Sequence, residues 1–290
     1  MAKNQKDKKE KAYKFYGLNV KLLSDERSGD SAYFSLIEDL YKKDVAAKIA
    51  SEKAMTLRNQ FRTTIKWKGN SYDVLYGKIT RFTLLEGDNW YNKKTHEFEK
   101  VETPLDKHPN GFETDYYFIP AAHRFFIKVD SKVGINSTER FLQRALKEVT
   151  ASTEDFSVHV IQSEDALEQI LSAKELSLLK VNVSYTNDDI GKEAQELIDD
   201  LLKNGQVGEL DAVLKPDQKG TLDPQSNLVK GLLEISRENG TAEATIKDNE
   251  GKRKKIITHE YPQKITIVSA SDDDVLARLL FHVLQTYRDE

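Results

Sequence analysis

Three residues have the types and spacing of a magnesium-dependent nuclease site. Asp115 precedes a predicted strand, and Asp130 and Lys132 form a D-x-K pattern after another one. Two carboxylates can hold a Mg²⁺ ion while a lysine stabilises the charge that develops on a phosphate group. The pattern also arises easily by chance at strand ends, and the helix that should precede the first acid is missing. We keep these three residues as catalytic candidates, but favour a protein that is not an enzyme.

Basic residues form a second group that could contact phosphates. Lys252, Arg253, Lys254 and Lys255 are four consecutive cations at the tip of a predicted hairpin, in a part of the chain that is otherwise acidic. Cations held near phosphates release counterions, and this release can dominate sequence-nonspecific binding of nucleic acid. The cluster predicts a nucleic-acid contact, and a solvated tip without a partner is the alternative.

The predicted strands between residues 60 and 85 carry further cations. Arg62, Lys66, Lys68 and Arg81 are candidate nucleic-acid contacts, and Trp67 lies among them. Because side chains alternate between the two faces of a strand, we expect Lys66 and Lys68 on one face and Trp67 on the other. Trp67 should therefore lie in the core rather than on a surface that stacks bases. For these four cations we favour an ordinary solvated face.

No pattern indicates a metal centre or a bound cofactor, and we expect neither. The six histidines lack the H-x-x-x-H and H-E-x-x-H spacings of metal ligands, and the chain contains no cysteine. The glycine-rich patterns that hold nucleotide phosphates and the G-x-S-x-G of serine hydrolases are absent. The lack of cysteine fits a reducing compartment, and no apolar run is long enough to span a membrane. The sequence thus predicts a cytoplasmic protein without membrane contact.

Charge is divided unevenly along the chain. Residues 1–150 hold 28 Lys and Arg against 21 Asp and Glu, a balance of +7, whereas residues 151–290 hold 16 against 27, a balance of −11. A basic half beside an acidic half suggests that the first faces a polyanion. Chance clustering on solvated faces is the alternative.

The elements that must position these residues indicate an α+β fold. Patterns with the two-residue period of strands occupy residues 13–22 and much of residues 60–129. A helix is expected over residues 31–43, and Ser137 opens another one. We therefore predict a β-rich N-terminal domain with flanking helices and a basic arm, residues 1–172.

The rest of the chain predicts a smaller α+β domain, residues 173–290. A strand over residues 178–185 is followed by a helix that ends at Gly205, and a second helix covers residues 227–237. The hairpin that carries the four cations comes next. A final helix over residues 272–287 is apolar on most of its sides, and such a helix is normally buried. Its own domain or a second copy of the chain could bury it, and we favour a dimer contact.

The C-terminal region resembles a known family in the order of its elements. The segments "LKVNVSY", "TAEATIKDNEGKRKKIITHEY" and "DDDVLARLLFHVLQTYRDE" are similar to the C-terminal region of the RexA/KwaB-like bacterial anti-phage defence family. In that family a strand and a helix also precede a D-x-x-G hairpin, an H-x-Y element and a last helix. The N-terminal part resembles it only through "FIPAAHRFFI" and its β-rich pattern. The resemblance implies a homodimer that binds DNA without strong sequence preference and serves phage defence or exclusion. It implies no catalytic residues, and the basic tip has no counterpart in it.

Taken together, the residues and the resemblance lead to one expectation with two alternatives. We expect a homodimeric nucleic-acid-binding protein, acting on DNA rather than RNA, in a bacterial anti-phage system that can include a partner protein of the same defence locus. The first alternative is a metal-dependent nuclease effector. The second is a protein-binding module of a defence complex, whose acidic second half recognises a basic partner.

Overall fold

The structure is a computed structural model that describes residues 10–288, except 25, 86, 88, 103, 105, 185–192 and 219. Helices and strands alternate irregularly along the described chain, and the strands form antiparallel sheets. The expected α+β class is confirmed. Most of the basic N-terminal segment expected at residues 1–12 lies outside the described residues. Within the described residues, no helix has the length and apolarity required to cross a membrane.

A large antiparallel sheet organises the molecule. Its strands run in the order β14-β1-β8-β7-β4-β3-β2, and β9 pairs with β1 beside β14. The strands are β1 (Lys11–Leu23), β2 (Ala46–Ala50), β3 (Lys53–Trp67), β4 (Asn70–Thr83), β7 (Phe112–Ile119), β8 (Arg124–Lys128), β9 (Asp155–Val160) and β14 (Lys264–Ser269). β1 is long enough to pair with β14 through its first half and with β9 through its second half.

The hairpin of β3 and β4 contains a close backbone approach. The pairing register shifts between Leu57 and Asn59, which places one extra residue in β3. Opposite this bulge lies Gly77, where an added Cβ would meet the carbonyl oxygen of Asn59 at 2.1 Å. Only glycine fits there, and bulges of this kind increase the local twist of a sheet.

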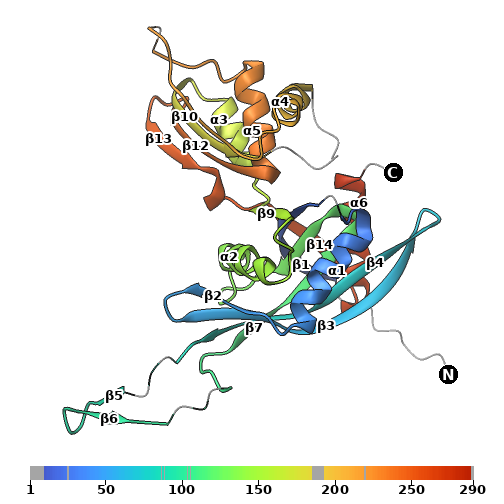
Figure 1. Ribbon diagram of the computed structural model, residues 1–290. Helices are drawn as coiled ribbons and strands as arrows, with labels where there is room; N and C mark the ends of the chain where they lie inside the picture. Colours follow the sequence, from blue (N-terminus) through green and yellow to red (C-terminus); the bar gives the residue numbers. More distant parts are fainter. Residues whose placement is uncertain are drawn as a thin grey trace, which may run out of the picture.

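Each face of the large sheet is covered by helices that form a separate apolar core. On one face, α1 (Gly29–Lys42) and α2 (Ile135–Ala145) pack on the sheet through side chains such as Leu36 and Phe141 (Figure 1). On the other face, α6 (Val275–Tyr287) buries six of its side chains against Phe15, Phe126 and the inward side chains of β14. The final helix is thus buried by its own chain, not by a second copy.

A smaller unit contains a four-stranded antiparallel sheet with three helices. Its strands are ordered β11-β10-β12-β13, and its helices pack on one face around a third apolar core. The elements are α3 (Glu164–Leu171), β10 (Glu175–Val183), α4 (Glu193–Asn204), β11 (Leu210–Leu214), α5 (Asn227–Asn239), β12 (Gly240–Lys247) and β13 (Arg253–Ile257). The expected strands and helices of the second half are therefore present.

The smaller unit is an insertion into the large one. The chain leaves the large sheet at Gln162 and returns at Pro262, and these two residues form an isolated β-bridge. Beside it, the N–H of Ser163 donates to the carbonyl of Tyr261 at 2.7 Å. We expected a division at residue 172, with residues 173–290 as one unit. Instead, α3 belongs to the core of the smaller unit, whereas β14 and α6 complete the large one.

A separate two-stranded hairpin projects from the large unit. It consists of β5 (Asn89–Asn92) and β6 (Glu97–Lys100), and we call residues 89–101 the arm. Figure 1 shows the arm reaching away from the rest of the molecule. The remaining elements are the single 3₁₀ turns η1 (Pro120–Ala122), η2 (Leu146–Glu148), η3 (Thr258–Glu260) and η4 (Asp272–Asp274).

Candidate nucleic-acid interface

Lys252 lies in the turn between β12 and β13, whereas Arg253, Lys254 and Lys255, which were expected at the tip, are the first three residues of β13. Asp248 shapes this turn because its Oδ1 accepts hydrogen bonds from the backbone N–H groups of Glu250, at 3.1 Å, and Lys252, at 2.8 Å. Gly251 has a φ of +82°, a conformation that costs glycine little and other residues more. The turn is therefore held in one geometry that projects the following residues.

The four cations have different surroundings. The side chains of Lys252 and Arg253 are exposed, and within the described part of the chain they have no acidic partner. Lys254 points towards the helices and donates to Oε1 of Gln169 in α3 at 2.6 Å. Lys255 lies on the open face of the small sheet, 3.0 Å from Oε2 of Glu243. Two of the four charges are therefore available to a polyanion.

Glu243 balances the cations of the open face. Its carboxylate lies between Lys255 and Lys180, with Lys180 at 3.5 Å. The hydrogen bond from Lys255 and the positive charge of Lys180 lower the pKa of Glu243 below its ordinary value. The open face thus carries paired charges, whereas the tip at Lys252 and Arg253, which we call the basic tip, does not.

The cations of β3 and β4 are largely engaged within the chain. Arg62 pairs with Asp73 at 2.6 Å and lies over the ring of Phe34, and Arg81 lies over the ring of Phe112. Lys68 does not lie opposite Trp67 as expected, because its Nζ is 4.5 Å from the centre of that ring. Lys66 is exposed. The favoured interpretation of an ordinary solvated face fits these contacts better than a binding surface.

Trp67 packs inward. Its ring stacks on Phe281 of α6 with 6.2 Å between ring centres, and it borders the core beneath that helix. This placement agrees with the expectation that Trp67 is a core residue rather than a platform for bases.

The three nuclease candidates do not form one site. Asp115 of β7 lies between two lysines, with Lys78 at 2.5 Å and Lys128 at 3.6 Å. Asp130 uses its Oδ1 to accept the backbone N–H groups of Lys132, at 2.6 Å, and Val133, at 3.1 Å, and so fixes the turn before α2.

Lys132 lies on the wrong side of the sheet to act with Asp115. Its ammonium group lies 5.4 Å from the centre of the Phe112 ring, on the face that α1 and α2 cover. Phe112 and Asp115 are three positions apart in one strand, so their side chains point to opposite faces. No group of three or more acidic or histidine side chains in the described residues is placed to hold a metal ion.

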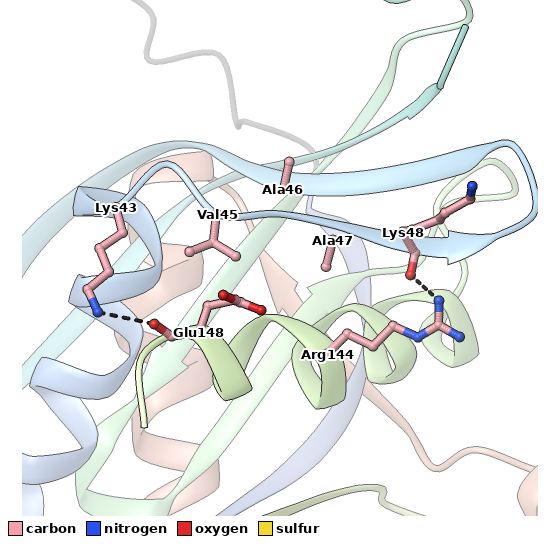
Figure 2. Close-up of a pocket in the computed structure, with 7 residues that line it drawn as sticks. All are labelled: Lys43, Val45, Ala46, Ala47, Lys48, Arg144 and Glu148. Atoms are coloured by element: carbon pink, nitrogen blue, oxygen red, sulfur yellow. Dashed lines mark hydrogen bonds between the residues drawn. The ribbon is translucent and has the colours of Figure 1, made fainter. Parts of the chain in front are cut away.

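A cationic groove lies between the edge strand β2 and the end of α2 (Figure 2). It has a volume of about 520 Å³ and is lined by Lys43, Val45, Ala46, Ala47, Lys48, Arg144 and Glu148. Lys43 donates to the carbonyl of Glu148 at 3.1 Å, and Arg144 donates to the carbonyl of Lys48. These bonds hold the cationic ends of Lys43 and Arg144 at the groove, where Glu148 is the one acidic lining residue. This groove was not foreseen from the sequence, because strand β2 was not expected.

Buried polar residues join the two units. Arg124 of β8 is fully buried and bonds to Glu238 of α5, and Asn19 of β1 donates to Asn239 at 3.0 Å. Nearby, a cavity of about 280 Å³ is bordered by Lys21, His159 and residues at the edge of the small sheet. Burial, together with the charge of Lys21, lowers the pKa of His159 to about 4. These residues were missed because each stands alone in the sequence, without a motif.

The family of the chain is shown by a match over most of its length. A family model described as a domain of unknown function, DUF4747, matches residues 11–284. The chain belongs to this family. The match begins with β1 and ends within α6, so it covers both the large sheet and the inserted unit. No curated protein matches the chain.

Proposed function

We propose that the protein binds nucleic acid without strong sequence preference, DNA in preference to RNA, through the basic tip of the inserted unit. The observation that carries this proposal is the uncompensated charge of Lys252 and Arg253 on a turn that Asp248 and Gly251 hold in place. Cations held at fixed positions lose little freedom when they contact phosphates, and each contact releases counterions. The protein acts in the cytoplasm, which the cysteine-free chain favours.

The resemblance to the RexA/KwaB-like family adds the biological setting to this proposal. It supports a homodimer that serves a bacterial phage-defence or phage-exclusion system. The binding surface itself rests on the charge and geometry of the basic tip, because that family offers no counterpart to it. A nuclease is not proposed, since Asp115 and Lys132 lie on opposite faces of the sheet.

Binding of purified protein to short double-stranded DNA, followed by fluorescence anisotropy, tests the proposal. The variant Lys252→Glu/Arg253→Glu should lose most of the binding. The matched control is Lys174→Glu/Lys215→Glu, which reverses two exposed cations of the inserted unit outside the basic tip. The control should bind like the unaltered protein, because only the position of the reversed charges differs.

Each other outcome has a defined meaning. Equal losses in both variants would show that overall charge alone governs binding, and the basic tip would no longer be the site. No binding of the unaltered protein at low salt would overturn the proposal. The alternative of a protein-binding module would then be tested by purifying the protein with its bound partner.

A further inference from the structure

Four large apolar side chains of the arm are exposed. Tyr91 is 55% exposed, Phe98 is 70% exposed, and Trp90 and Val101 are also exposed. Isolated two-stranded hairpins are at best marginally stable in water, and exposed apolar side chains that gather on one element commonly mark an interaction site. The arm is therefore built to contact another surface.

The two faces of the arm differ in chemistry. Cross-strand partners share a face, so Trp90 lies with Glu99, and Asn92 with Glu97. Tyr91 and Phe98 share the opposite face with 5.5 Å between their ring centres. One face is thus aromatic, whereas the other combines one indole with two carboxylates. This second face, defined by Trp90, Glu97 and Glu99, is called the acidic face of the arm.

The charge of the acidic face does not suit a polyanion. Glu97 and Glu99 are both exposed, and Glu99 is held by a hydrogen bond from Asn92 at 3.2 Å. Two carboxylates beside an indole favour a surface that offers cations next to small apolar groups. The acidic face is therefore complementary to a basic protein surface, whereas the lysines of the arm lie at its turn (Lys93, Lys94) and on the aromatic face (Lys100).

The cationic groove of Figure 2 has the complementary chemistry. Lys43 and Arg144 lie at the groove, Lys48 lies at its rim, and Glu148 is its one acidic residue. Val45 and Ala47 form the apolar floor of the groove between the cations, and both are mostly buried in the core. The groove also follows β2, which is the last strand of the large sheet and has an unpaired edge.

We propose that the acidic face of the arm docks in the cationic groove of a second copy of this chain. Figure 1 shows the arm extended away from its own body, so reciprocal exchange between two copies would place each arm in the groove of the other. Such an exchange has twofold symmetry and closes after two copies. The inference deepens the homodimer of the proposed function, and it does not depend on whether the protein binds nucleic acid.

Charge reversal in both directions tests this interface by sedimentation equilibrium without nucleic acid. The arm-reversed variant is Glu97→Lys/Glu99→Lys, and the groove-reversed variant is Lys43→Glu/Lys48→Glu. Each alone should raise the dimer dissociation constant by at least roughly a hundredfold, because like charges would face each other. Asp165→Lys/Glu168→Lys on the exposed side of α3 is the matched control and should leave the dimer intact.

Rescue separates a direct contact from a general disturbance. An equimolar mixture of the two reversed variants should form a heterodimer, because each arm then meets a groove of opposite charge. A chain carrying both reversals should regain its homodimer. Failure of both rescues, a dimer that persists in the arm-reversed variant, or an unaltered protein that stays monomeric would each overturn the proposal. The basic-tip variant can lose DNA binding without any effect on this test, because the dimer is measured in the absence of nucleic acid.

Discussion

The guanidinium of Arg124 is fully buried, and its Nη2 lies 2.5 Å from Oε2 of Glu238. Arg124 belongs to β8 of the large sheet and Glu238 to α5 of the inserted unit. The arginine also bonds to Oδ1 of Asn19 at 2.5 Å and stacks over the ring of Tyr287 at 4.4 Å. This pair therefore joins the two units and the final helix at one point.

Removing one partner of this pair should destabilise the protein strongly. Glu238→Ala leaves the buried charge of Arg124 without its carboxylate, and such a loss costs about 3–5 kcal/mol. Replacing both residues, in Arg124→Met/Glu238→Leu, should recover most of the stability, because the charge of Arg124 is removed and Arg237, the other partner of Glu238, keeps its ion pair with Glu164. Urea unfolding measures both. A loss below about 1 kcal/mol in Glu238→Ala would mean that the pair does not join the units.

Stability should fall with acidification because His159, half-buried in the folded protein, favours its neutral form there. Its pKa in the folded protein is about 4, whereas the unfolded chain has an ordinary histidine pKa near 6.5. Between these values the unfolded state binds the extra proton, so its free energy falls relative to the folded state. The loss between pH 6.5 and pH 4 amounts to about 3 kcal/mol at most. His159→Gln should flatten this part of the stability profile, and an unchanged slope would contradict the assignment.

Glu154 should remain ionised in acid that protonates most carboxyl groups. Its two oxygens accept from Arg27 at 2.6 and 2.8 Å, and these bonds lower the pKa of Glu154 to about 2. The stabilising effect is complete above the ordinary carboxyl pKa and is lost as the pH falls towards 2. Arg27→Gln should raise the pKa of Glu154 towards its ordinary value. Carboxyl carbon NMR titration follows this directly, and an unmoved titration would refute the role of Arg27.

The large unit should still fold when the inserted unit is deleted, but not when the C-terminal end of the chain is deleted. Replacing residues 163–261 by a short flexible linker leaves every strand of the large sheet in place, since Gln162 and Pro262 are already adjacent. Because the deletion also removes Glu238, the partner of Arg124, it is combined with Arg124→Met, and this chain should give a cooperative unfolding transition. The fragment of residues 1–172 lacks β14 and α6, exposes the core around Phe15 and Phe126, and should aggregate. A soluble, cooperatively folded 1–172 fragment would contradict the described arrangement.

Local structure was predictable from the sequence because local patterns determine it. Alternation in residues 13–22 corresponds to β1, and the D-x-x-G pattern at Asp248 and Gly251 corresponds to the turn of the basic tip. The short edge strand β2 escaped prediction, since alternation over so few residues is a weak signal.

Long-range relationships were not predictable in the same way. β14 pairs with β1 although the two strands lie near opposite ends of the sequence. The pattern of residues 264–269 predicts a strand but does not indicate which strand it pairs with. The division at residue 172 missed the insertion for this reason. The predicted nuclease site does not form because Phe112 and Asp115 point to opposite faces of the sheet. Lys132 packs on Phe112 and therefore lies on the face opposite to Asp115. The pair of Arg124 and Glu238 likewise carries no motif, as its partners meet only in the folded chain.

The salt dependence of DNA binding tests the central claim most directly. Affinity of the unaltered protein for a short duplex should fall linearly with salt on logarithmic axes, and neutralising Lys252 and Arg253 to glutamine should reduce the slope by about 2. Lys174→Gln/Lys215→Gln, which neutralises two exposed cations elsewhere on the inserted unit, should leave the slope unchanged. An identical slope in the unaltered protein and the basic-tip variant would show that these two cations touch no phosphate and would contradict the proposed function.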